Sequence, residues 1–147
     1  MIYIGIMISI CYFIFMIWLA SGIISYKSSE NKNYFPNISI IVSAHNGKIY
    51  KKKLLNSLID QSYPSKYEIL IANACSTDLT PSILQNYIDD YNFIQLIKIP
   101  KTPIGWEDKK WALSECIKHA QYDIILQTDI DCIPLNSWIK SMAAEFS

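Results

Sequence analysis

The chain has 147 residues, which is enough for one compact domain and too few for two. The hydrophobic fraction is 51%, and Lys+Arg and Asp+Glu both total 13, so the formal net charge is zero. Because there is neither a basic surplus nor an acidic tail, we expect no nucleic-acid partner and no solvating acidic segment.

The first 26 residues carry no charged side chain and are rich in Ile, Phe and Met. About 20 apolar residues cross the hydrocarbon core of a bilayer, so we predict one transmembrane helix over 1–26 and a polar linker over 27–35. Lys27 and Lys32 follow the segment, and by the positive-inside tendency the remainder faces the cytoplasm. The alternative is a cleaved signal peptide with Ala20–Ser21–Gly22 as its small-residue site.

From residue 36 onward, β-branched runs alternate with helical patterns. We predict strands over 38–43, 67–72, 93–99 and 122–128, and helices over 49–61, 80–91, 108–120 and 137–146. The third strand alternates with polar residues, which favours a sheet edge. In the third helix the spacing places Trp111, Ala112, Cys116 and Ile117 on one inward face. The alternation predicts an open, mostly parallel α/β sheet that binds ligands at the carboxyl ends of its strands.

An acidic pair follows the fourth predicted strand. Asp129 and Asp131 are separated by one residue, and residues i and i+2 of an extended segment point the same way. Two carboxylates with nothing basic beside them in the sequence need a cation, and oxygen ligands suit Mg²⁺ or Mn²⁺. Such an ion would also bind a substrate diphosphate. The pattern predicts a metal site.

Other polar residues near the strand ends are open to two interpretations. Lys109 and Lys110 begin the third helix and either reach a diphosphate or are solvated. Residues 76–78 (STD) form a turn and helix entry or border a nucleotide. His45 has no partner in the sequence, and His119 late in a helix is expected at the surface.

The four cysteines, Cys11, Cys75, Cys116 and Cys132, are scattered and form no C-x-x-C pair. This spacing favours unpaired thiols in a reducing compartment over a zinc site.

Two other enzyme classes fit the motifs less well. Haloacid-dehalogenase phosphatases place Asp-x-Asp after the first strand, usually with Thr two residues beyond, whereas here it follows the fourth strand and Ile133 stands at that position. A dinucleotide-binding domain needs G-x-G-x-x-G, and the four glycines of the chain form no such cluster.

Three stretches, taken in order, resemble the family 2 glycosyltransferases of the GT-A fold. They are PNISIIVSAHN, LLNSLIDQSYPSKYEILIANACSTDLT and KKWALSECIKHAQYDIILQTDIDCIPLNSWIKSM. The resemblance spans about residues 35–146. It implies a membrane-bound enzyme that transfers a sugar, with inversion and with Mg²⁺ or Mn²⁺, from a nucleotide-sugar donor to a lipid or glycan acceptor.

The resemblance also implies roles for single residues. The nucleotide-sugar site would comprise Ala44, Asn46, Ala74, Lys109 and Asp129, and the metal site Asp129 and Asp131. Two positions depart from the family pattern: Ala74 replaces a carboxylate that usually contacts the donor base, and Asp108 replaces a Gly before Lys109. In the family the general base and a Gln-x-x-Arg-Trp element lie well beyond the acidic pair, so we expect the catalytic base to lie outside these 147 residues.

Two alternatives remain at this point. The first is a truncated, non-catalytic, membrane-anchored remnant or subunit that keeps the fold without turnover. The second is a nucleotidyltransferase of similar fold, which would bind a nucleoside triphosphate. Metal-dependent binding of a nucleotide sugar distinguishes the glycosyltransferase from the remnant.

Overall fold

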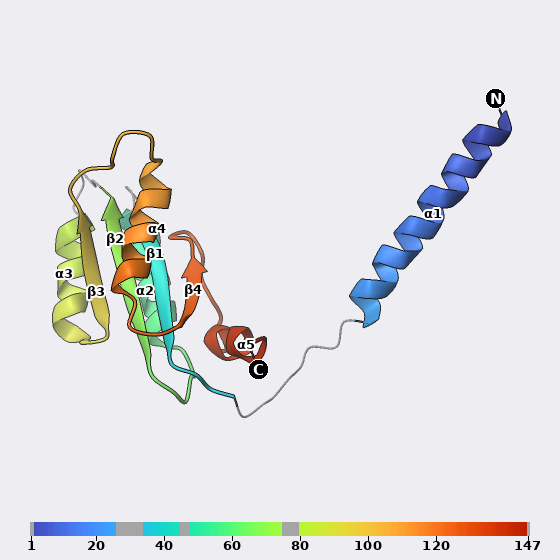
Figure 1. Cartoon of the computed structure of the whole chain (residues 1–147). Helices are drawn as coiled ribbons and strands as arrows, with labels where there is room; N and C mark the ends of the chain where they lie inside the picture. The colour runs from blue at the N-terminus through green and yellow to red at the C-terminus, as the bar shows by residue number, and fades with distance from the viewer. Residues whose placement is uncertain (1, 26–33, 45–47, 75–79, 147) are drawn as a thin grey trace. The chain divides into compact units, whose positions relative to one another are not determined.

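The computed structural model describes residues 2–25, 34–44, 48–74 and 80–146, which belong to two units, Met1–Glu30 and Asn31–Ser147. In the first unit, helix α1 (Ile2–Ser25) is shown in blue in Figure 1. Within it, Tyr3–Gly22 is long and apolar enough to span a membrane by length and composition, with a mean hydropathy of 2.2. A helix was predicted here. That it crosses a membrane stays a prediction.

The second unit contains a parallel sheet of four strands in the order β3-β2-β1-β4 (Figure 1). The strands are β1 (Ile38–Ala44), β2 (Tyr67–Ala74), β3 (Ile94–Ile99) and β4 (Ile124–Thr128). All three strand pairings are parallel, as the alternating pattern predicted. The predicted edge position of β3 is confirmed, and β4 forms the other edge of the described sheet.

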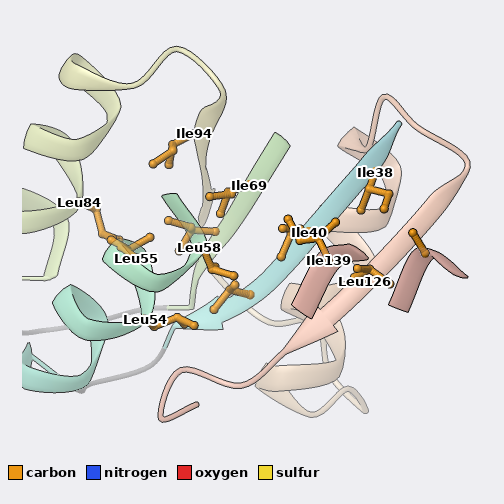
Figure 2. Close-up of a cluster of buried hydrophobic side chains, with 13 residues drawn as sticks. Ile38, Ile40, Leu54, Leu55, Leu58, Ile69, Leu84, Ile94, Leu126 and Ile139 are labelled. Atoms are coloured by element: carbon orange, nitrogen blue, oxygen red, sulfur yellow. The ribbon is translucent and has the colours of Figure 1, made fainter. Parts of the chain in front are cut away.

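Helices lie on both faces of this sheet. They are α2 (Lys48–Ile59), α3 (Thr80–Asp90), α4 (Asp108–His119) and α5 (Trp138–Ala144). Successive side chains of a strand point to opposite faces, so β1 contributes to two separate clusters. Ile38 and Ile40 pack with residues of α2, α3 and α5 (Figure 2), whereas Ile41 packs with α4.

The prediction that Ile117 of α4 lies in the core is wrong. Ala112 and Cys116 are fully buried against β1 and β2, but Ile117 is 51% exposed. Residues four apart lie on one helix face, and the next residue is rotated by about 100° away from it. Because Ala112 and Cys116 are small, α4 meets the sheet along a narrow stripe that leaves Ile117 in solvent.

A buried polar network lies on the α4 face at the amino end of the sheet. Glu68, 4% exposed, accepts hydrogen bonds at Oε1 from the Ser39 hydroxyl at 2.6 Å and the Gln121 N–H at 2.7 Å. Ser39 Oγ in turn accepts from the Tyr122 N–H at 3.1 Å, and Gln95 Nε2 donates to Glu68 Oε2 at 3.4 Å. The network ties the connection between α4 and β4 to β1 and β2.

The network also explains a wrong strand boundary. The sequence pattern predicts that the fourth strand starts at Tyr122, yet β4 begins at Ile124. The backbone N–H of Tyr122 is used by Ser39 and so belongs to the buried network. The paired ladder with β1 starts two residues later, where Ile38 meets Ile124.

Candidate functional site

A pocket of about 500 Å³ lies at the carboxyl ends of β1 and β4. It is lined by Ser43, Glu107, Asp108, Lys109, Asp129, Ile130 and Asp131. The pairing of Val42 with Thr128 brings the residues that follow them to one edge of the sheet. Because α4 follows the loop after β3, its first turn meets the same edge. Lys109, Asp129 and Asp131, which the sequence singled out, therefore share one pocket.

A tight turn before α4 places the first helical turn at the pocket. The Trp106 N–H donates to the Pro103 carbonyl at 3.1 Å, and Gly105 between them has φ +88°. That left-handed conformation is accessible to glycine and strained for most other residues. Two residues after Trp106 the chain reaches Asp108, the first residue of α4.

Lys109 and Asp129 form an ion pair across the pocket. The Lys109 ammonium donates to Asp129 Oδ1 at 2.6 Å, and both side chains are about half exposed (49% and 51%). The hydrogen bond to Asp129 is the largest cause of a raised Lys109 pKa; the charges of Asp129, Asp131 and Glu107 act in the same direction, and partial desolvation opposes them. The sequence has no basic residue beside the acidic pair, but the fold brings one to it from α4.

The acidic pair itself adopts a turn, so the predicted extended geometry is wrong. The Cys132 N–H donates to the Asp129 carbonyl at 3.2 Å. The ladder between β4 and β1 ends at Thr128, and beyond it the backbone is free to turn. Asp129 and Asp131 nevertheless line the same pocket, and both are exposed.

The pocket has an excess of negative charge. Its lining includes four carboxylates, from Glu107, Asp108, Asp129 and Asp131, and one ammonium, from Lys109. Glu107 is also paired with Lys110, whose ammonium lies 3.2 Å away. Such a lining attracts cations. Over the described residues, no three His, Cys, Asp or Glu side chains converge as metal ligands, so an ion here would need further oxygens from a substrate or water.

The remaining candidate residues are only partly covered by the structure. Ala44 and Ala74 end β1 and β2, and the register places their backbones at the carboxyl edge. Asn46, His45 and residues 76–78 lie outside the described residues, as does Cys75.

Two further positions can be compared with their predictions. His119 is exposed in the last turn of α4, as predicted, and its Nδ1 lies 2.8 Å from the Glu115 carbonyl oxygen. Cys11, Cys116 and Cys132 are free thiols, so the prediction of unpaired cysteines is confirmed for these three.

Sequence reasoning missed one polar residue at this edge. Glu107 lines the pocket, although nothing in its spacing marks it. Asn73 lies near the carboxyl end of β2, and its Oδ1 is buried with no hydrogen-bond partner in the described structure.

The model of glycosyl transferase family 2 matches residues 39–147. The chain belongs to this family. It is 29% identical over 109 residues to the probable glycosyltransferase YdaM of Bacillus subtilis, covering 74% of this chain and 26% of that protein. It is 28% identical over 107 residues to the poly(ribitol-phosphate) beta-N-acetylglucosaminyltransferase TarS of Staphylococcus aureus, covering 72% and 18%. The chain thus spans about a quarter or less of the length of these two relatives.

Solved structures confirm the predicted GT-A fold. S. aureus TarS 1–349 in complex with UDP-GlcNAc matches with a TM-score of 0.60 and 29% identity, over 74% of this chain and 30% of that chain. The mannosyltransferase PcManGT of Pyrobaculum calidifontis, solved with GDP-Man and Mn²⁺, matches with a TM-score of 0.73 over 89% and 38%. Its identity of 23% means that this second likeness shows the fold alone.

Proposed function

We propose that this chain is the donor-binding part of a metal-dependent glycosyltransferase, which binds the diphosphate of a nucleotide sugar in the acidic pocket. The observation that carries the proposal is the meeting of Lys109, Asp129 and Asp131 in one pocket at the carboxyl ends of β1 and β4. TarS, a relative by sequence and fold, was solved with UDP-GlcNAc, which supports a nucleotide sugar as the donor.

The residues of the pocket fit a divalent cation. Mg²⁺ and Mn²⁺ commonly take one or two protein carboxylates and complete their coordination with phosphate oxygens and water. Asp129 and Asp131 are two exposed carboxylates in a pocket with excess negative charge, and we assign the metal to them. When bound, the ion would neutralise charge on the diphosphate as it leaves.

The protein's own groups would bind and orient the donor. Lys109 lines the pocket and carries a positive charge that can pair with a phosphate oxygen. The amino end of α4 adds backbone N–H groups and the positive end of the helix dipole, which favour a phosphate. Ala44, Asn46 and Ala74 would line the nucleotide by the family resemblance. Since Ala74 has no side-chain acceptor, we expect weak discrimination between uracil and guanine.

The acceptor, the stereochemistry and the location complete the proposal. The sugar would pass with inversion to a lipid or glycan at the cytoplasmic face of a membrane, with α1 as the anchor. Tyr3–Gly22 supports the anchor, and Lys27 and Lys32 support the orientation. A variant that retains Cys132, which is exposed, as its single cysteine tests this orientation, by labelling of whole cells with a membrane-impermeant maleimide. Modification before the cells are permeabilised would contradict a cytoplasmic site.

The central experiment measures binding of UDP-GlcNAc and GDP-mannose to the full chain in detergent, with and without Mn²⁺, by isothermal titration calorimetry. Asp131→Asn removes the charge of a proposed metal ligand. Asp123→Asn is the matched control, because Asp123 is exposed and directly precedes β4, at the end of the strand opposite to the pocket. We expect Mn²⁺-dependent binding that Asp131→Asn weakens roughly tenfold or more, since even outer-shell partners of a metal commonly change its affinity 10–100-fold.

The control should leave binding unchanged. Donor binding that is the same with and without Mn²⁺, or equal effects of Asp131→Asn and Asp123→Asn, would contradict the metal site. No binding of either donor under any condition would instead favour the remnant that keeps the fold without turnover.

A further inference from the structure

The ion pair at the pocket occupies a carboxylate that the proposed metal also needs. Lys109 Nζ lies 2.6 Å from Asp129 Oδ1, the distance of a direct charged hydrogen bond. An ammonium at this distance and a divalent ion on the same carboxylate would repel each other. Metal binding at Asp129 therefore has to displace Lys109 or act against its charge.

We propose that Lys109 is an exchangeable counter-cation, which pairs with Asp129 while no diphosphate is bound and transfers to the diphosphate when the donor and metal bind. The inference rests on the proposed function, which it extends from the identity of the ligands to the way in which their binding is coupled.

The pair is built in a way that permits exchange. Both side chains are about half exposed, so neither is held by burial, and within the described ranges the partner of Lys109 is a single carboxylate oxygen. Exposed ion pairs of this kind are weak, and water replaces each partner at little cost. The lysine stem has four rotatable bonds, which lets the ammonium move within the pocket without moving α4.

The neighbouring lysine is arranged differently. Lys110 is paired with Glu107 at 3.2 Å across the first turn of α4, and its side chain is 74% exposed. Over the described residues Lys110 forms no ion pair with Asp129, and it does not line the pocket. Lys110 is therefore a matched control that carries the same charge one residue away.

Exchange couples the two ligands. In the absence of diphosphate, Lys109 competes with the metal for Asp129 and weakens metal binding. A diphosphate supplies Lys109 with new acceptors and releases Asp129 to the metal. By linkage, each ligand then raises the affinity of the other by the same factor, so metal and donor bind together rather than separately.

The test measures Mn²⁺ binding to the full chain in detergent micelles at low ionic strength, by the loss of the free-ion electron paramagnetic resonance signal. It compares the unmodified chain with Lys109→Met and Lys110→Met, each titrated alone and with saturating UDP. Without UDP we expect Lys109→Met to bind Mn²⁺ about two- to five-fold more tightly than the unmodified chain, the factor that an exposed ion pair supplies. Lys110→Met should change the Mn²⁺ affinity by clearly less than Lys109→Met does.

With UDP the order should change. UDP should raise Mn²⁺ affinity less in Lys109→Met than in the unmodified chain, because the lysine that the diphosphate displaces is gone. Equal effects of the two lysine substitutions, or weaker Mn²⁺ binding by Lys109→Met alone, would overturn the exchange while leaving the metal site intact. If the unmodified chain binds neither Mn²⁺ nor UDP, the proposed function fails and the exchange fails with it.

Discussion

Replacement of the buried Glu68 by Ala tests how the connection into β4, the strand that ends at the acidic pair, is held. Glu68 accepts hydrogen bonds from the Ser39 hydroxyl and the Gln121 N–H through one oxygen, and from Gln95 through the other. Glu68→Ala removes all three acceptor contacts. Glu68→Gln is the matched control, since its amide oxygen can still accept from Ser39 and Gln121.

The structure sets the size of the expected effect. Ser39 is 0% exposed, so its hydroxyl cannot turn to water when its acceptor is lost. A buried donor left unsatisfied costs about 1–3 kcal/mol, and deletion of a buried side chain leaves a cavity that adds to this. Gln121 is exposed, and its N–H can be solvated at lower cost. We therefore expect Glu68→Ala to lower the free energy of unfolding by about 2–4 kcal/mol.

Glu68→Gln should lower the free energy of unfolding by no more than about 1 kcal/mol, because the oxygen that accepts from Ser39 and Gln121 stays and the amide of Gln95 can rotate to offer its own oxygen. The assay is urea unfolding of the full chain in detergent, followed by tryptophan fluorescence, to which the second unit contributes Trp106, Trp111 and Trp138. The loss of stability in Ser39→Ala should lie between those of Glu68→Ala and Glu68→Gln. This substitution removes the donor to Glu68 and the acceptor of the Tyr122 N–H together. Equal losses for Glu68→Ala and Glu68→Gln would refute the reasoning, since the negative charge rather than the acceptor geometry would then matter.

Two further predictions concern titratable groups away from the pocket. Burial raises the pKa of the Cys116 thiol to about 12. Iodoacetamide at pH 8 should therefore modify the exposed Cys132 and leave Cys116 unmodified in the folded chain, which peptide mass mapping would show. Alkylation of Cys116 without denaturant would contradict its burial. Burial, helped by Tyr34, raises the pKa of Tyr63 to about 12, while an unfolded tyrosine titrates near 10. The stability from Tyr63 is thus complete below pH 10 and is lost as the pH rises toward 12, because the unfolded chain releases its proton first. Tyr63→Phe should make the decline of urea stability from about pH 10 toward pH 12 shallower, and an unchanged slope would count against this assignment.

The amino-acid sequence by itself determined the class of fold and most of its elements. Strand and helix periodicities depend on neighbours a few residues apart, so β-branched runs such as 38–43 and helical spacings such as 49–61 could be recognised locally. The predicted strands and helices occur with shifts of a few residues at their ends. The parallel arrangement followed because each strand is joined to the next by a helix. Asp129 and Asp131 could be singled out for the same reason, as they directly follow an apolar strand.

Only the tertiary structure decided which charges and hydrogen bonds meet. The order β3-β2-β1-β4 places β4 beside β1, although 79 residues separate Ala44 from Ile124. That order brings Lys109 to Asp129 and Gln121 to Glu68. The turn at Asp129 likewise depends on where the ladder with β1 ends, which no local pattern encodes. Periodicity is a property of adjacent residues, whereas an ion pair or a buried acceptor depends on distances that exist only once strands have paired and helices have packed on them.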